Sequence, residues 1–418
     1  MMESTLYAGA YEFKLDNGLR ILVEEVPQSR SVSAGVWIRA GSRDDPATLP
    51  GLAHFVEHLA FKGSETRDAR AISHEIDAVG GHLNAATAKE STFYYADVPA
   101  DGVETALDVL ADLTLRPRFD PSDLELERNV VLEEIRGHED DPEQTAYDLF
   151  SAGLWADRHP VARSVVGTRD AIASASREDV AAFHRATYQP DNMILAVCGR
   201  VHAEDIARLA QERFSSFRLD DCASPPARTV PVFQAVTAHH PQSTGMTHVY
   251  LATPGPTAAH DDRITLEVAN SILGDGTSSR LFHSIRESRG LAYVISSYVH
   301  SFSDGGVWLT YAGIAPKNRQ TVLDLIRSEF ENLLSNSIPQ AELDLAKSKL
   351  RGHLILGMET NGHRASRLAN AALQNRPILS PDELLARLDA ATRDGVHDVL
   401  SKYLRLDQMN IATIGPAA

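Results

Sequence analysis

The sequence predicts an α+β protein made of two homologous domains. Stretches typical of strands and of helices follow one another in runs without strict alternation, which favours α+β over a doubly wound parallel sheet. The second half of the chain repeats the order of the first, and copies of about 200 residues indicate a duplicated domain and not a short-repeat array. Adjacent prolines without periodicity mark a linker, so we expect an N-terminal domain over 1–216, a linker over 217–232 and a C-terminal domain over 233–418.

The N-terminal copy begins with strands and continues with helices. Its predicted elements are, in order, a hairpin over 11–25, a strand over 31–42, helices over 46–63 and 67–80, a strand over 91–99 and a helix over 101–115. The hairpin rests on Asn17-Gly18, which lies between two alternating runs. Glycines at 63 and at 80–81 end the two helices.

The C-terminal copy shows matching segments in the same order. They are a helix over 264–276, a helix, glycine stop and strand over 279–299, a helix over 318–334 and a long helix over 341–360. The long helix matches residues 121–140 of the first copy. The second copy lacks the His-x-x-Glu-His pattern of the first copy, so it keeps the scaffold without that site.

Composition narrows the class of protein. The chain has 418 residues with 43 % apolar and 23 % charged content, as in ordinary globular proteins. Its net charge of −17 argues against a nucleic-acid partner and is compatible with basic peptides, although acidic charge also serves solubility. Two cysteines predict reduced thiols. Without a signal-peptide pattern or an apolar run of about 18 residues, we expect a cytoplasmic protein that does not span a membrane.

The stretch LAHFVEHLAFKG, residues 52–63, carries the strongest chemical signal. At 100° per residue, His54, Glu57 and His58 fall on one face of a helix. Two imidazoles one turn apart can share a Zn²⁺ ion, and the glutamate between them can take a proton from the attacking water. A histidine pair on a helix is a weak indication by itself, because most such pairs at protein surfaces bind nothing.

A third ligand is expected from the predicted helix over 120–137. Its apolar stripe consists of Leu124, Val131 and Ile135. Glu127 and Glu134 each follow a stripe residue by three positions, so we expect both to border the buried face. A carboxylate near a core needs a partner, and a zinc site with Glu134 as ligand and Glu127 behind it supplies one. The alternative for Glu127 is a buried salt bridge.

His-x-x-Glu-His is the inverted zincin motif. The match extends further, through HFVEHLAFKGSETR, ERNVVLEEI, GGHLNAATAKESTFYY and RESRGLAY. Over essentially its whole length the sequence resembles the pitrilysin/insulinase family, and most closely the branch of the mitochondrial processing peptidase β subunit and its bacterial relatives.

The resemblance implies a zinc endopeptidase with one Zn²⁺ per chain. It implies the following roles: His54, His58 and Glu134 as metal ligands, Glu57 as general base, Glu127 in the second shell of the metal, Asn84, Arg286 and Tyr293 as substrate-binding residues, and Tyr293 also as a catalytic hydrogen-bond donor. Peptide substrates would bind extended, as an added strand near Asn84.

The resemblance also implies an assembly. Each half would be an α/β roll with its sheet covered by helices, and one chain would form half of a clamshell chamber. Because the chain carries both the zinc motif and the Arg/Tyr pair, we expect a homodimer, while a heterodimer with a related chain stays open. The alternatives are a non-catalytic or partner-dependent subunit of such a heterodimer, and a metal-dependent amidase that acts on small molecules.

Overall fold

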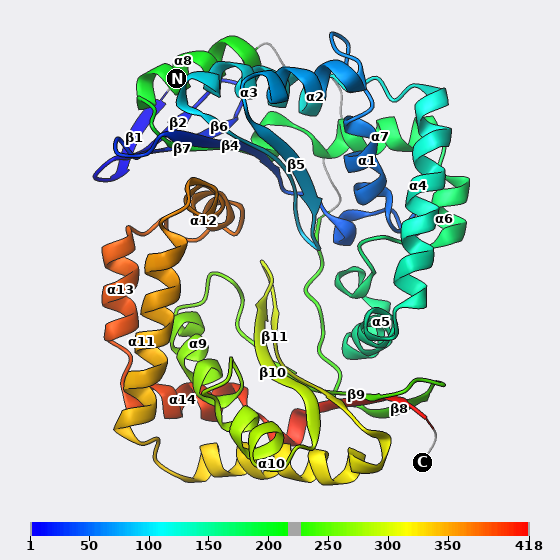
Figure 1. Ribbon diagram of the computed structural model, residues 1–418, viewed down its shortest axis with the longest axis vertical. Coiled ribbons are helices and arrows are strands. Elements are labelled where there is room, and N and C mark those ends of the chain that lie inside the picture. The colour runs from blue at the N-terminus through cyan, green and yellow to red at the C-terminus, as the bar shows by residue number, and fades with distance from the viewer. Residues whose placement is uncertain (1, 216–226, 417–418) are drawn as a thin grey trace. The chain divides into compact units, whose positions relative to one another are not determined.

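The computed structural model describes residues 2–215 and 227–416 and divides into two compact units (Figure 1). Unit 1 comprises residues 1–138, 163–228 and 356–380. Unit 2 comprises residues 139–162, 229–355 and 381–418. The part of the predicted linker that precedes residue 227 lies outside the described residues.

Unit 1 contains a seven-stranded sheet in the order β1-β2-β3-β7-β4-β6-β5. The β3–β7 pair is parallel and the other pairs are antiparallel. The strands are β1 (Met2–Tyr7), β2 (Ala10–Lys14), β3 (Arg20–Glu25), β4 (Ser31–Ile38), β5 (His82–Thr87), β6 (Thr92–Pro99) and β7 (Met193–Gly199). One edge of the sheet is therefore β5, which pairs with β6 on one side only.

Helices cover both faces of this sheet. The helices of unit 1 are α1 (Leu52–Ala60), α2 (Ala69–Ala78), α3 (Val103–Leu115), α4 (Pro121–Asp140), α6 (Arg169–Ser174), α7 (Arg177–Thr187), α8 (Ala203–Phe214) and α12 (Asn361–Leu373). Helices α3 and α8 pack on one face, and α12 packs on the other against β3, β4 and β7 (Figure 1). The larger core includes Val36, Phe55 and Leu107, and a smaller one joins Trp37 to Leu368 of α12.

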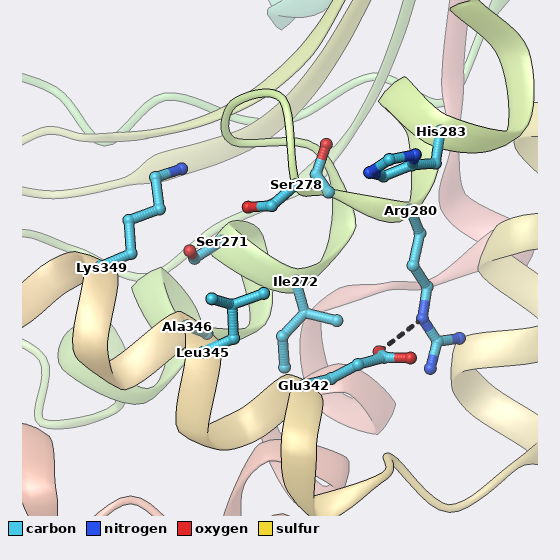
Figure 2. A pocket seen from close by; sticks show the side chains of 10 residues that line it. Ser271, Ile272, Ser278, Arg280, His283, Glu342, Leu345, Ala346 and Lys349 are labelled. Atoms are coloured by element: carbon cyan, nitrogen blue, oxygen red, sulfur yellow. Dashed lines mark hydrogen bonds and ion pairs between the residues drawn. The ribbon is translucent and has the colours of Figure 1, made fainter. Parts of the chain in front are cut away.

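Unit 2 contains a five-stranded sheet in the order β10-β11-β9-β12-β8, with β8 and β12 parallel. Its strands are β8 (Thr237–Pro241), β9 (Thr247–Pro254), β10 (Ala292–Ser301), β11 (Gly306–Ile314) and β12 (Asn410–Gly415). Its helices are α5 (Pro142–Leu154), α9 (Asp262–Leu273), the π-helix η6 (Phe282–Glu287), α10 (Arg319–Ser335), α11 (Gln340–Gly357), α13 (Pro381–Asp389) and α14 (Arg393–Tyr403). A pocket lies beside α9 and α11 (Figure 2).

The two units exchange helices along the sequence. Helix α12 comes from the C-terminal half of the chain but covers the unit 1 sheet, where Arg367 pairs with Glu24 at 3.1 Å. Helix α5 comes from the N-terminal half but packs in unit 2, where the Phe150 ring stacks on Tyr250 with centroids 4.7 Å apart. The compact units therefore differ from the predicted division at 216 and 233, because an amphipathic pattern shows that a helix has a buried face without showing which sheet buries it.

The predicted α+β class with two sheet-plus-helix units is confirmed. The predicted hairpin is formed by β2 and β3, and the predicted helix over 101–115 is α3. The predicted helix after residue 279 is a short π-helix. In the described part of the chain, no helix has both the length and the apolar character needed to cross a membrane.

Candidate metal centre

Helix α1 carries two histidines, and its first turn is buried and held by hydrogen bonds. Gly51 precedes the helix with a φ of 97°, a conformation that favours glycine. The buried carboxylate of Asp45 accepts hydrogen bonds from the backbone N–H groups of Gly51 at 2.6 Å and Ala53 at 2.8 Å, which satisfies donors that the first turn leaves open. Phe55 and Leu59 lie in the core, whereas His54 and His58, about 100° away from them around the helix, are the only residues of α1 that are not fully buried.

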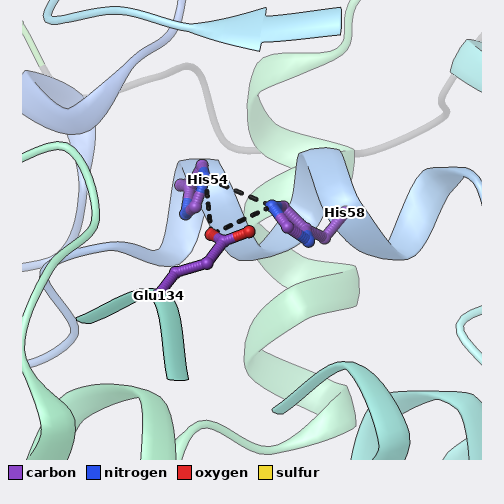
Figure 3. Close-up of side chains that lie close together, drawn as sticks. All are labelled: His54, His58 and Glu134. Carbon is purple, nitrogen blue, oxygen red and sulfur yellow. Dashed lines mark hydrogen bonds and ion pairs between the residues drawn. The ribbon is translucent and has the colours of Figure 1, made fainter. Parts of the chain in front are cut away.

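Three side chains converge beside this helix. The Nε2 atoms of His54 and His58 lie 3.2 Å apart, and a carboxylate oxygen of Glu134 lies 3.7 Å from the first and 3.5 Å from the second. Figure 3 shows both imidazoles on α1 and the carboxylate of Glu134 pointing toward them from a separate segment. Ligand atoms of all three residues lie within 4.8 Å of one another.

These distances fit a tetrahedral metal ion. Two ligand atoms at about 2.05 Å from zinc in tetrahedral geometry are about 3.3 Å apart, close to the three separations observed. Burial, together with the neighbouring His58, lowers the pKa of His54 to about 4, so its imidazole is neutral at pH 7, which is the form that binds metal. Two imidazoles and one carboxylate are a donor set suited to zinc.

Glu127 supports the second histidine from behind. Its side chain is 6 % exposed, and an Oε atom lies 3.1 Å from Nδ1 of His58. Its other oxygen pairs with the ammonium group of Lys62. When Nδ1 donates to this carboxylate, the lone pair of Nε2 points toward Glu134 and His54, as a metal ligand requires. Glu127 thus contacts His58 and also forms the ion pair with Lys62 that the alternative expected, while its role in supporting a metal ion stays a prediction.

Glu57 lies beside the cluster but outside it. The residue is 9 % exposed, and its carboxylate accepts a hydrogen bond of 2.6 Å from the hydroxyl of Thr87 on β5. Burial raises the pKa of Glu57, while the Thr87 hydrogen bond and His58 oppose this effect and Glu134 adds to it. A carboxylate with a raised pKa is a stronger proton acceptor than an ordinary one, as a general base requires.

Helix α4 brings Glu127 and Glu134 to the site. Leu124, Val131 and Ile135 are buried, as the stripe predicts. Glu134 lies at the edge of this buried face with a side chain that is 43 % exposed, so the burial expected for a carboxylate near the core is found for Glu127 and not for Glu134. Glu134 comes one residue before Ile135, about 100° from it around the helix, so its carboxylate can reach the two histidines of α1 while one side stays open to solvent.

The predicted substrate residues occupy exposed positions. Asn84 is exposed on the edge strand β5 of unit 1, the strand that also carries Thr87. Arg286 lies on η6 of unit 2 with its guanidinium over the Phe282 ring, 5.0 Å from the centroid. Tyr293 is 66 % exposed on β10, an edge strand of the unit 2 sheet. Their contact with a substrate stays a prediction.

Two supporting residues were missed from the sequence. Lys62 follows His58 by four positions, in the turn just after α1 ends at Ala60, so its closeness in the sequence could have suggested it as a neighbour of Glu127. Thr87 is 30 positions from Glu57, and no local pattern joins an edge strand to a helix at that separation.

Comparison with known proteins decides the family. The family model described as Insulinase (Peptidase family M16) matches residues 20–169, and the model of the Peptidase M16 inactive domain matches residues 174–350. An uncharacterized zinc protease of Mycobacterium leprae is 39 % identical over 98 % of this chain and 93 % of its own length. The chain belongs to the M16 peptidase family. The predicted family is thereby confirmed.

Other relatives agree with this M16 assignment. An uncharacterized zinc protease of Bacillus subtilis is 32 % identical over 97 % of this chain and 98 % of its own length. The crystal structure of a protease from Helicobacter pylori has a TM-score of 0.90 at 24 % identity, covering 97 % of this chain and 99 % of that one. A structure from Pseudomonas fluorescens, titled as a peptidase M16 inactive domain, has a TM-score of 0.91 at 22 % identity, covering 98 % of each chain. The structural likeness shows that the fold is shared.

Proposed function

We propose that this M16 chain is a zinc-dependent endopeptidase that hydrolyses extended peptides. The observation that carries the proposal is the convergence of two imidazole Nε2 atoms and the Glu134 carboxylate, with the buried carboxyl group of Glu57 beside them. The relatives named zinc proteases agree with it. His54, His58 and Glu134 would hold the ion, one per chain.

The protein's own groups do the proton chemistry. Zinc held at such a site supplies a Lewis acid that polarises the peptide carbonyl and acidifies water. Glu57 takes the proton of the attacking water and delivers it to the leaving amine. The hydroxyl of Thr87 holds the Glu57 carboxylate in one orientation during both transfers. Glu127 keeps His58 in the tautomer whose Nε2 binds metal.

The edge strand β5 suggests how the substrate binds. An edge strand offers unpaired backbone N–H and C=O groups to a second extended chain. Thr87 on this strand contacts Glu57, so a peptide paired with β5 would run close to the base. Asn84, exposed on the same strand, would contact the peptide. Backbone pairing selects unfolded segments and discriminates weakly between sequences.

The first experiment tests zinc, base and substrate together. The purified chain and Glu57→Gln are analysed for metal content and incubated with a mixed peptide library, with cleavage read by mass spectrometry. Glu133→Gln, an exposed carboxylate on α4, serves as the matched control. We expect about one zinc per chain in all three proteins and cleavage by the parent and the control only. Absence of zinc from the parent would remove the proposal, and zinc without cleavage would favour the partner-dependent subunit.

We further propose that two chains form one chamber, in which a partner's Arg286 and Tyr293 grasp the peptide and Tyr293 donates a hydrogen bond to the developing oxyanion. A mixing experiment tests this homodimer. In this scheme the homodimers of Glu57→Gln and of Arg286→Ala are each inactive. A mixed dimer contains one intact site, in which the Arg286→Ala chain supplies Glu57 and the Glu57→Gln chain supplies Arg286. Activity that returns on mixing supports the shared site. Activity that stays absent, while sedimentation shows mixed dimers, excludes it.

A further inference from the structure

One pocket of unit 2, beside α9 and α11, has a lining that the peptidase chemistry does not use. It has a volume of about 230 Å³ and lies between the C-terminal end of α9, the loop over 274–281, the start of η6 and one face of α11 (Figure 2). All of its lining residues belong to unit 2, whereas the candidate metal ligands belong to unit 1. The pocket therefore needs an explanation of its own.

Ser271 is the first indication of a ligand. The residue is 4 % exposed, and its Oγ atom has no hydrogen-bond partner among the described residues. A buried hydroxyl without a partner is unfavourable, and the few that occur need a reason. Figure 2 shows Ser271 on the pocket wall, on the same side as Lys349 and Ser278. An acceptor atom in the pocket would satisfy this hydroxyl.

Lys349 is held with its ammonium group at the loop. Its Nζ atom donates to the Asp275 carboxylate at 2.8 Å and to the Asp275 carbonyl, so one of its three N–H bonds is left for another acceptor. Gly276 permits this approach: its φ is +87°, and a Cβ there would lie 2.7 Å from Nζ. The loop over 274–281 thus leaves room for the Lys349 ammonium group and supplies two of its acceptors.

The opposite wall adds further donors. Arg280 donates through Nε to Glu342 at 2.8 Å, and among the described residues its four terminal N–H bonds find no acceptor. His283 and Ser278 line the same pocket and are exposed. The one carboxylate in the lining, Glu342, is already paired with Arg280. The uncommitted groups are mainly donors, so the complementary ligand is rich in acceptors.

The pocket also has an apolar side and a limited size. Ile272, Leu345 and Ala346 line it, and Leu345 is 52 % exposed. The volume corresponds to about eight water molecules in the liquid. We propose that this pocket binds a small organic anion of about that size, with a carboxylate or phosphate group at Ser271, Ser278 and Lys349 and its carbon skeleton on Ile272 and Leu345.

Calorimetric titration with succinate and with inorganic phosphate tests the site. Potassium chloride at matched ionic strength controls for charge screening. The variants are Ser271→Ala, which removes the buried hydroxyl, and Lys349→Met, which removes the cation. Lys347→Met is the matched control, because Lys347 lies on the same helix and donates to the Asp389 carbonyl outside the pocket. We expect saturable binding that each test variant weakens about tenfold or more and the control leaves unchanged.

The thermal melts give a second readout that guards against misfolding. Without anion, Ser271→Ala should melt at the parent's temperature or above, because the lost hydroxyl makes no hydrogen bond. Adding anion should raise the melting temperature of the parent but not that of Ser271→Ala. Binding of phosphate alone assigns a phosphorylated ligand, and binding of succinate alone assigns a carboxylate. Absence of saturable binding for both anions, or equal affinity in parent and Ser271→Ala, overturns the proposal.

Discussion

Replacing Glu127 by glutamine tests how much the metal site depends on a residue that does not touch the metal. The Glu127 carboxylate lies between two donors, the Nδ1–H of His58 at 3.1 Å and the ammonium group of Lys62. A glutamine amide has one acceptor oxygen and one NH₂ group. It can serve one of these donors, and its NH₂ group then faces the other. The substitution therefore removes a charge-assisted hydrogen bond in a place that is almost closed to water.

The expected loss follows from that geometry. Substitution of a partner behind a metal-bound histidine costs 10- to 100-fold in metal affinity, or about 1.4 to 2.7 kcal/mol. We expect the upper half of this range, because the side chain is 6 % exposed and water cannot replace the lost acceptor.

Competition for zinc against a fluorescent chelator measures the change. Glu133→Gln is the control, since it removes the same charge from the same helix at a side chain that is 65 % exposed. Near-ultraviolet circular dichroism verifies that each variant is folded. A zinc affinity for Glu127→Gln within threefold of the parent, with normal spectra, would refute the role assigned to Glu127.

Three further predictions concern the base, the pH dependence and the exchanged helix. Thr87→Val should lower kcat about tenfold with little change in KM, and Thr87→Ser should restore it; an unchanged kcat would show that Glu57 needs no such support. Burial lowers the pKa of His184 to about 4, so between pH 6.5 and 4 this imidazole is protonated in the unfolded chain but not in the folded one. The free energy of unfolding should therefore decrease by at most about 3 kcal/mol as the pH is lowered from 6.5 to 4. Denaturant titrations at several pH values should show that His184→Gln lacks this part of the pH dependence of the free energy of unfolding. The same pH dependence in the variant and the parent would contradict the assignment to His184. Leu368→Ala on α12 should cost about 2–5 kcal/mol of stability, whereas Leu356→Ala at an exposed position should cost little, and equal losses would count against the packing of α12 on the sheet.

Much of the candidate site could be predicted because its information is local. His54, Glu57 and His58 lie within five residues, so helical geometry alone places them on one face. Glu127 and Glu134 come from one helix whose apolar stripe is regular. That α4 meets α1 was a hypothesis from the two carboxylates beside its stripe, and the resemblance to a known family strengthened it, because periodicity shows that each helix has a buried face and does not show what covers it.

What could not be predicted depends on contacts between distant residues. The Thr87 hydroxyl contacts Glu57 through the pairing of a sheet edge with α1, and no local pattern encodes that pairing. The exposure of Glu134 was not predicted for a related reason. Its position beside the apolar stripe suggested burial, but the side chain turns toward α1 and stays open to solvent on one side. The exchange of α5 and α12 between the units was not predicted, because nothing in the sequence of either helix shows that it packs on the sheet of the other half of the chain.

The exchange of helices has a consequence for the order in which the chain folds during synthesis. Asn361 at the start of α12 donates to the Ser31 carbonyl, a contact that spans 330 residues. Until the ribosome has made α12, the face of the first sheet that includes Leu22 and Trp37 has no cover. A nascent chain that already contains the whole zinc motif therefore exposes an apolar surface for tens of seconds at typical elongation rates. We expect the first sheet to gain its full cover only once α12 has left the ribosome, with an early need for chaperones.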